Sequence, residues 1–191
     1  AIGLNFADIY RRQGRYHLAG SPPWIAGYEA AGVVAAVHPQ DAGGAFAVGR
    51  RVAFADSAFA NAELVAVPLE RLIALPDDID AQTAAALLLQ GLTAQFLLED
   101  SHAVQAGETL LVHAAGGGVG QLLVQLANAK GAHVIALASS EDKRRSALAA
   151  GASHALDSGP GWVERVRATA PNGVDVAYDS IGRTLADSMA V

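Results

Sequence analysis

Hydrophobic and polar positions follow two different patterns along this chain of 191 residues. Over the first 80 residues, glycine and proline separate short β-prone runs at 32–37, 51–55 and 63–67. Almost no helical periodicity is present there, and short strands broken by turn residues are typical of a compact, mostly antiparallel β domain. We therefore expect the first part of the chain to be β-rich.

The pattern changes near Asp80, which can cap a helix whose apolar residues recur every three or four positions. Four short apolar strands follow, at residues 109–113, 133–138, 154–157 and 174–179. Helices are expected after them, at residues 120–130, 141–150, 161–169 and from 183 onward. This alternation predicts an α/β fold with a parallel sheet covered on both faces. We place the domain boundary between residues 1–81 and 82–191.

Composition and charge exclude several classes of protein. The chain has no cysteine, which excludes disulfides, thiolate zinc sites, iron–sulfur clusters and a cysteine nucleophile. Its net charge is −6 without a dense lysine or arginine stripe, so nucleic acid and anionic membranes are not expected partners. No apolar run approaches the roughly 18 residues of a membrane helix, and no export signal is visible at the start. A cytoplasmic location is therefore expected.

A glycine-rich turn, His-Ala-Ala-Gly-Gly-Gly-Val-Gly at 113–120, follows the first of the four strands and opens a helix. Such a strand–turn–helix context is the one in which a dinucleotide fingerprint has meaning. Gly117 would let a pyrophosphate approach the backbone, and Gly120 would let the helix pack closely on the strand. An ordinary structural turn is the alternative. The candidate cofactor-binding residues of the turn are Ala115, Gly116, Gly117, Gly118, Val119 and Gly120.

The end of the second strand indicates which dinucleotide is bound. NAD-binding proteins usually place an acid there, whereas this chain has Ser139 and Ser140. Three basic residues, Lys143, Arg144 and Arg145, follow within a turn and could meet a 2′-phosphate. We therefore expect NADPH rather than NADH. Two acids at 141–142 keep NADH open, and a solvated helix start needs no ligand at all.

Several short motifs occur in order along the chain: Asn5-Phe6-x-Asp8, Gly14-Arg15-Tyr16, Gly27-x-Glu29-Ala30-Ala31-Gly32-Val33, Gly91-Leu92-Thr93, the turn at 113–120, Lys143 and Tyr178-Asp179-Ser180-Ile181-Gly182. Together they resemble those of one known family, the zinc-independent quinone oxidoreductases (zeta-crystallin-like) of the medium-chain dehydrogenase/reductase superfamily. The resemblance covers essentially the whole chain. It implies a partial GroES-like catalytic domain followed by a partial Rossmann domain, with NADPH held between them and hydride transferred to a quinone or a conjugated enone.

The resemblance also argues against a catalytic metal. Zinc-dependent relatives place a cysteine near the position of Asn5 and a histidine at the position of Tyr28. An amide is a poor zinc ligand, no thiolate is available, and the six histidines lack ligand spacing. We therefore expect no metal site.

The same resemblance assigns roles to single residues. Asn5, Tyr10 and Tyr16 would line the substrate side and steady negative charge on the acceptor oxygen, although plain packing is the alternative for each. Thr93 would contact the cofactor near the nicotinamide, or else bond its own helix backbone. Ser139, Lys143 and Ser158 would lie on the adenosine side, where Ser158 stands near a position that is often aromatic.

Two further expectations concern the chain as a whole. It begins with Ala1 and closes on Val191 within an expected helix, so both ends are expected to be cut. The family suggests a homodimer whose interface would be missing here, and the isolated fragment would be poorly active. A dinucleotide-binding protein without significant catalysis, either crystallin-like or a truncated remnant, is therefore the alternative function.

Overall fold

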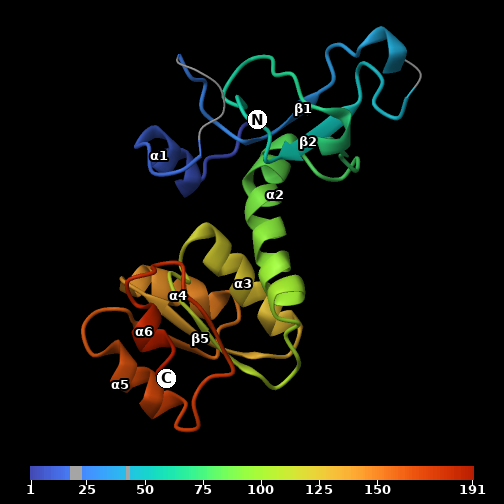
Figure 1. Ribbon diagram of the computed structural model, residues 1–191. Coiled ribbons are helices and arrows are strands. Elements are labelled where there is room, and N and C mark those ends of the chain that lie inside the picture. Colours follow the sequence, from blue (N-terminus) through green and yellow to red (C-terminus); the bar gives the residue numbers. More distant parts are fainter. Residues whose placement is uncertain (18–22, 42–43) are drawn as a thin grey trace. The chain divides into compact units, whose positions relative to one another are not determined.

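The computed structural model describes residues 1–17, 23–41 and 44–191 (Figure 1). They form two compact units, Ala1–Leu89 and Gln90–Val191. Helix α2 (Ala81–Phe96) crosses the division, and the boundary suggested by the sequence coincides with its first residue. Its start is capped as expected, because the Asp80 carboxylate accepts a hydrogen bond of 2.7 Å from the Thr83 backbone N–H.

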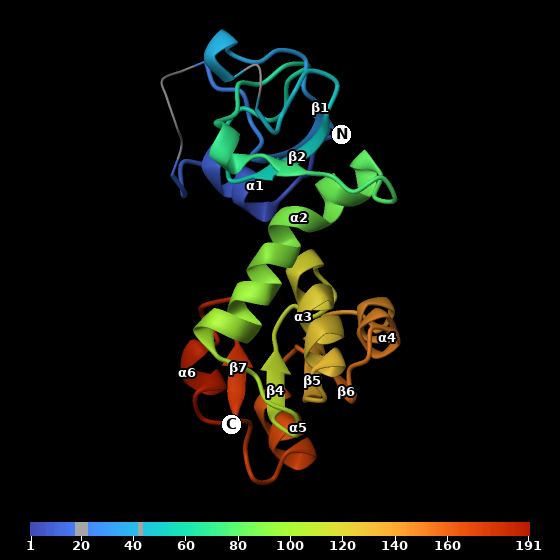
Figure 2. The ribbon, with the colours of Figure 1, turned by 90° about the vertical axis from the view of Figure 1, so that its right-hand side faces the viewer.

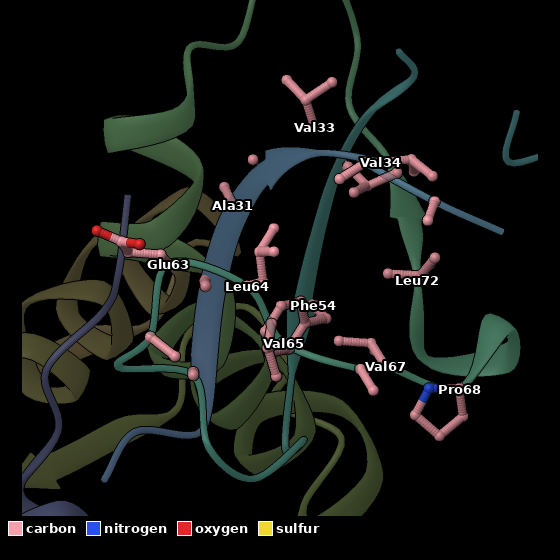
Figure 3. A pocket seen from close by; sticks show the side chains of 18 of the residues that line it. Ala31, Val33, Val34, Phe54, Glu63, Leu64, Val65, Val67, Pro68 and Leu72 are labelled. Atoms are coloured by element: carbon pink, nitrogen blue, oxygen red, sulfur yellow. The ribbon is translucent and has the colours of Figure 1, made fainter. Parts of the chain in front are cut away.

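The first unit contains an antiparallel sheet in the order β1 (Glu29–Val33), β2 (Arg51–Ala55) and β3 (Ile73–Ala74). The prediction of β2 is confirmed, whereas β1 begins before the predicted run at 32–37. The apolar segment at 63–67 forms a loop that lies along the sheet, in place of the predicted strand (Figure 3). Helix α1 (Phe6–Arg12) was not predicted, and its seven residues are too few to show a clear period.

Alternating residues of β1 and β2 pack in two directions. Ala31 and Ala53 pack with Ala84 and Ala85 of α2, whereas Ala30 and Phe54 face the other way. On that second side lies an apolar groove of about 750 Å³, whose lining includes Val34, Phe54, Leu64, Val65, Val67 and Leu72 (Figure 3). Asn5, Tyr10 and Tyr16 are not among the residues that line it.

The second unit is built on a parallel sheet in the order β6-β5-β4-β7 (Figure 2). This is the 3-2-1-4 order of a Rossmann half-sheet with one further strand. The predicted strands at 133–138 and 154–157 have the observed bounds, and β7 is shorter than predicted. The strands are β4 (Thr109–Val112), β5 (His133–Ala138), β6 (His154–Asp157) and β7 (Val176–Tyr178).

Helices cover both faces of this sheet, which confirms the predicted α/β class. Leu110 and Val112 of β4 pack on the side of α3 (Gly118–Ala129) and α4 (Glu141–Ala149). Leu111 points the other way, toward Trp162 of α5 (Trp162–Thr169). A π-helical turn at Leu97–Ser101 and a short helix α6 (Leu185–Ser188) complete the unit.

One segment differs from the expectation about membrane spans. By length and composition, Ala81–Ser101 is long and apolar enough to cross a membrane, with a mean hydropathy of 1.2 over its most apolar window. The polar side chains Gln90 and Thr93 interrupt its apolar run without lowering the average below that level. A core helix of a globular protein passes the same test, so this one helix is weak evidence for a membrane.

Candidate functional site

The glycine turn is fixed to the two strands beside β4. The His113 N–H donates to the Tyr178 carbonyl of β7 at 3.0 Å, and the Ala115 N–H donates to the Leu137 carbonyl of β5 at 3.0 Å. Between them Ala114 adopts a φ of +49°, an uncommon left-handed conformation for a residue with a side chain. The backbone therefore leaves β4 through a sharply defined bend that directs it into α3.

The glycines of the turn are required for different reasons. A Cβ atom on Gly120 would lie 2.7 Å from the Ala115 Cα, so this glycine permits the close approach of α3 to the strand, as the fingerprint predicts. A Cβ on Gly116 would lie 2.6 Å from the Lys143 Cβ, so Gly116 makes room for that side chain. A Cβ on Gly117 would meet only the Ala114 carbonyl oxygen, at 3.2 Å. Gly117 is thus the exposed glycine at which a ligand can approach the backbone.

The start of α3 has the properties of an anion site. Gly117 is its N-cap and provides no side-chain cap, so the first backbone N–H groups are left for an external acceptor. Ala115 and Gly120 are buried. Gly117 and Gly118 are exposed, and Val119 is partly buried. The residues present therefore fit a dinucleotide pyrophosphate.

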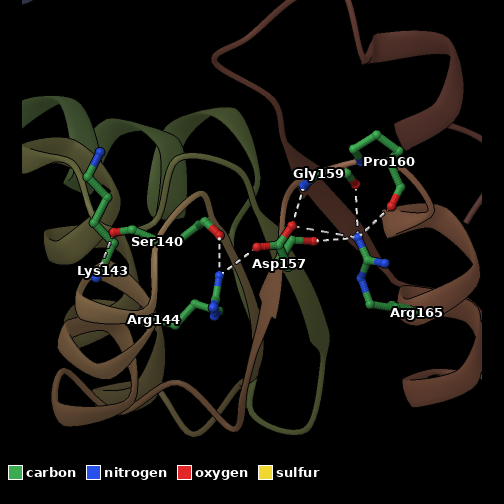
Figure 4. A network of polar contacts seen from close by, with 8 residues as sticks. Ser140, Lys143, Arg144, Asp157, Gly159, Pro160 and Arg165 are labelled. Atoms are coloured by element: carbon green, nitrogen blue, oxygen red, sulfur yellow. Dashed lines mark hydrogen bonds and ion pairs between the residues drawn. The ribbon is translucent and has the colours of Figure 1, made fainter.

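Three basic residues near the start of α4 have separate environments, and Figure 4 shows those of Lys143 and Arg144. Arg144 bonds the Asp157 carboxylate at 2.7 Å, and Arg145 pairs with Asp142. Across the described ranges, the Lys143 ammonium enters no ion pair, and its stem lies against Gly116 of the turn. Lys143 is therefore the base that is available to a 2′-phosphate, whereas Arg144 and Arg145 are each engaged with an acid.

The remaining cofactor-binding candidates lie at the ends of β5 and β6 and on α2. Ser139 is exposed at the end of β5, and the Ser140 hydroxyl caps α4 by accepting from the Lys143 N–H at 3.4 Å. Ser158 follows β6, and its N–H donates to the Ala138 carbonyl at 3.2 Å. Asp157 is held by the Gly159 N–H, which lowers its pKa more than burial raises it, and Arg144 and Arg165 lower it further (Figure 4). Thr93 lies exposed on α2.

A buried polar cluster behind the turn was missed by the sequence analysis. The Ser188 hydroxyl of α6 lies 2.9 Å from His113 Nε2 and 2.9 Å from Asp179 Oδ2. Burial lowers the pKa of His113 despite the Asp179 charge, so the ring is neutral and Nε2–H can donate to Ser188. Burial raises the pKa of Asp179, but hydrogen bonds from Thr184, Ile181, Gly182 and Ser188 outweigh it and lower the value to about 2. The cluster thereby joins α6 to the first residue of the turn.

A fully buried acid, Glu29, holds Asn5 in place in the first unit. The sequence analysis gave Glu29 no role. The Asn5 side-chain amide donates to Glu29 Oε2 at 2.9 Å, and the Leu89 backbone N–H donates to Glu29 Oε1 at 2.6 Å. The Asn5 N–H also donates to the Asp8 carboxylate at 3.0 Å, which gives Asp8 a structural role at the start of α1. Asn5 is therefore fixed from both its backbone and its side chain.

Arg11 organises the tyrosines of this unit. Its buried guanidinium lies 3.4 Å from the Tyr28 ring centroid and 5.0 Å from that of Tyr16. The Tyr16 ring is 56% exposed and Tyr10 is 44% exposed, so both rings present surface to solvent. Tyr28 and Asn5, at the two positions where zinc-dependent relatives have ligands, are engaged with Arg11 and Glu29 instead. Within the described ranges, no group of three or more His, Cys, Asp or Glu side chains could hold a metal ion.

Comparison with known families matches both units. Residues 1–77 match the alcohol dehydrogenase GroES-like domain, and residues 118–191 match the zinc-binding dehydrogenase family. The order of a GroES-like domain and a Rossmann-type domain defines the medium-chain dehydrogenase/reductase class. The chain is about 40% identical to quinone oxidoreductases, and the resemblance predicted from the motifs is confirmed.

Individual relatives support the same assignment. The chain is 42% identical to the 2-haloacrylate reductase of a Burkholderia species and 43% identical to a probable quinone oxidoreductase of Schizosaccharomyces pombe, covering 96% and 98% of this chain. It superposes on the Escherichia coli quinone oxidoreductase complexed with NADPH with a TM-score of 0.91, at 37% identity over 98% of this chain. The chain spans 56–58% of the length of these three relatives.

Proposed function

We propose that this chain belongs to an NADPH-dependent oxidoreductase that transfers hydride to a quinone or a conjugated enone without zinc. The observation that carries the proposal is the glycine turn, with its uncapped α3 start, exposed Gly117 and adjacent Lys143. Solved structures of relatives with the same fold, from Escherichia coli and Thermus thermophilus, are NADPH complexes. This supports NADPH as the ligand of the turn.

Each proposed cofactor contact has a physical role. The α3 N–H groups and Gly117 would bind the pyrophosphate, and Lys143 would bind the 2′-phosphate through a charge-assisted contact. The bound cofactor supplies the hydride, while the protein supplies orientation and electrostatics. Thr93, Ser139 and Ser158 are proposed to contact the cofactor elsewhere along its length.

For the substrate, we propose that Asn5, Tyr10 and Tyr16 donate hydrogen bonds to the acceptor oxygen, where negative charge develops. The contacts that fix Asn5 and Tyr16, to Glu29 and Arg11, support this role because a preorganised donor loses little freedom on binding. Hydride addition to a quinone, followed by a proton from solvent, gives the hydroquinone. Addition to a conjugated enone, followed by protonation, gives the saturated ketone.

The test has a binding step and a turnover step. Intrinsic fluorescence would be titrated with NADPH and NADH, and NADPH oxidation would then be followed with 1,4-benzoquinone and with 2-chloroacrylate before and after exhaustive chelation. NADPH binding with quinone-dependent oxidation that survives chelation supports the proposal. Tight NADPH binding without turnover on either acceptor favours the non-catalytic alternative. Absence of NADPH binding by the folded chain refutes both.

A further inference from the structure

The side chain of Gln90 enters the glycine turn from α2. A Cβ atom added to Gly118 would overlap Gln90 Oε1, would lie 2.5 Å from Gln90 Cδ and would lie 3.1 Å from Nε2. The absent side chain of Gly118 is thus the space that the Gln90 carboxamide fills. Sequence analysis assigned Gly118 to the cofactor alone, whereas the structure pairs it with a residue 28 positions earlier.

The position of this carboxamide matters because Gly118 is the first residue of α3. The N–H groups of that first turn have no side-chain cap, and the helix dipole makes this end positive. An anion bound there would lie beside Gln90.

We infer that Gln90 is a further dinucleotide-contacting residue, which binds the pyrophosphate segment opposite the α3 N-terminus; this rests on the proposed function. A carboxamide suits the position in both states of the site. Its oxygen is compatible with the positive helix end when no ligand is bound, and its NH₂ group donates to a phosphate oxygen when the dinucleotide is present. Lys143, by contrast, lies on the side of Gly116 and serves the adenosine end.

The inference assigns Gln90 to the pyrophosphate and Lys143 to the adenosine end of the dinucleotide. Two ligands that differ in the pyrophosphate therefore test it. NADPH contains the pyrophosphate, whereas adenosine 2′-monophosphate carries the 2′-phosphate and no phosphate at the 5′ position. Gln90→Ala should raise the Kd for NADPH about 10- to 150-fold through loss of one hydrogen bond to a charged group. The Kd for the monophosphate should stay within about twofold of the parent value, because its phosphate contact lies at Lys143.

A second variant distinguishes a lost contact from a loss of folding. Gln90→Glu keeps the shape of the side chain and places a negative charge beside the pyrophosphate, so its NADPH Kd should rise further and should depend on salt. Gln95→Ala and Gln95→Glu are matched controls, since Gln95 lies on the same helix, is exposed and bonds Glu99 at 3.3 Å. Circular dichroism would establish that every variant folds like the parent.

The outcomes are distinguishable. A parent chain that binds NADPH while both Gln90 variants bind it equally well overturns the inference and leaves the proposed function standing. An equal loss of affinity for both ligands in Gln90→Ala also overturns it, because Gln90 would then act on the whole site. A folded parent chain that binds neither ligand overturns the inference together with the proposed function.

Discussion

The stem of Lys143 lies against Gly116, so that a Cβ atom at Gly116 would be 2.6 Å from the Lys143 Cβ and 2.8 Å from its Cγ. Lys143, which follows β5 in the sequence, is thereby held beside the glycine turn that follows β4. Gly116 is therefore explained by a neighbouring side chain, and the lysine is placed at the ligand side of the turn by packing rather than by an ion pair.

This relationship gives a charge-reversal test of cofactor preference. Lys143→Glu should weaken NADPH binding by ~1–3 kcal/mol, because a charge-assisted contact to the 2′-phosphate is lost, and NADH binding should change far less. Fluorescence titrations with both cofactors measure the difference. Arg145→Glu is the matched control, since Arg145 lies on the same helix but pairs with Asp142. An equal effect on the two cofactors would show that Lys143 does not bind the 2′-phosphate.

Two glycines of the turn should respond differently to substitution. Gly117→Val should abolish NADPH binding with little change in circular dichroism, because a branched side chain would fill the ligand space while the fold has only the Ala114 carbonyl nearby. Gly120→Ala should instead destabilise the fold by about 1–3 kcal/mol, since its Cβ would press on the backbone of Ala115. Urea unfolding and NADPH titration of both variants test this. Undiminished NADPH affinity in Gly117→Val would mean that the turn is only structural.

The sequence predicted the second unit well because its strands are buried on both faces and read as continuous apolar runs, such as 133–138. It predicted the first unit less well. The apolar run at 63–67 has the composition of a strand but lines a groove as a loop, and α1 is only seven residues long. Neither feature leaves a clear periodic signal.

The candidate site was predictable where chemistry is local in sequence and not where it depends on tertiary packing. The glycine turn is recognisable from its glycine spacing between a strand and a helix, and Lys143 from its position just after the next strand. The contact of Gln90 with Gly118 and the bond between His113 and Ser188, 75 positions apart, arise only when separate elements meet. Glu29 could have been suspected, because an acid within the apolar run at 28–33 needs buried partners.

The stability of the second unit should fall on mild acidification. Burial lowers the pKa of His113 in the folded state, so the unfolded chain binds more protons as pH falls through about 6.5. Stability is therefore greatest above that value and decreases between about pH 7.5 and 5.5. Asp179, with a pKa of about 2, loses its contribution only at much lower pH, as pH falls below about 4.

Urea unfolding at a series of pH values measures this effect. Trp162 packs edge-on against the His113 ring at 5.0 Å and reports on the second unit once Trp24, the other tryptophan, is replaced by Phe. His113→Gln should flatten the dependence between about pH 7.5 and 5.5 because it removes the titrating group. A slope in His113→Gln equal to that of the parent would assign the acid sensitivity to other groups.

The buried carboxylate of Glu29 should be a main determinant of the stability of the first unit. Glu29→Ala removes the buried carboxylate that accepts hydrogen bonds from the Leu89 N–H and the Asn5 amide, and we expect a loss of about 2–4 kcal/mol. Glu29→Gln, which keeps the volume and one acceptor oxygen, should lose less. Urea unfolding followed through Trp24, in a Trp162→Phe background, measures the first unit, and exposed Glu70→Ala is the matched control. A loss in Glu29→Ala no larger than in Glu70→Ala would mean that these two hydrogen bonds contribute no net stability.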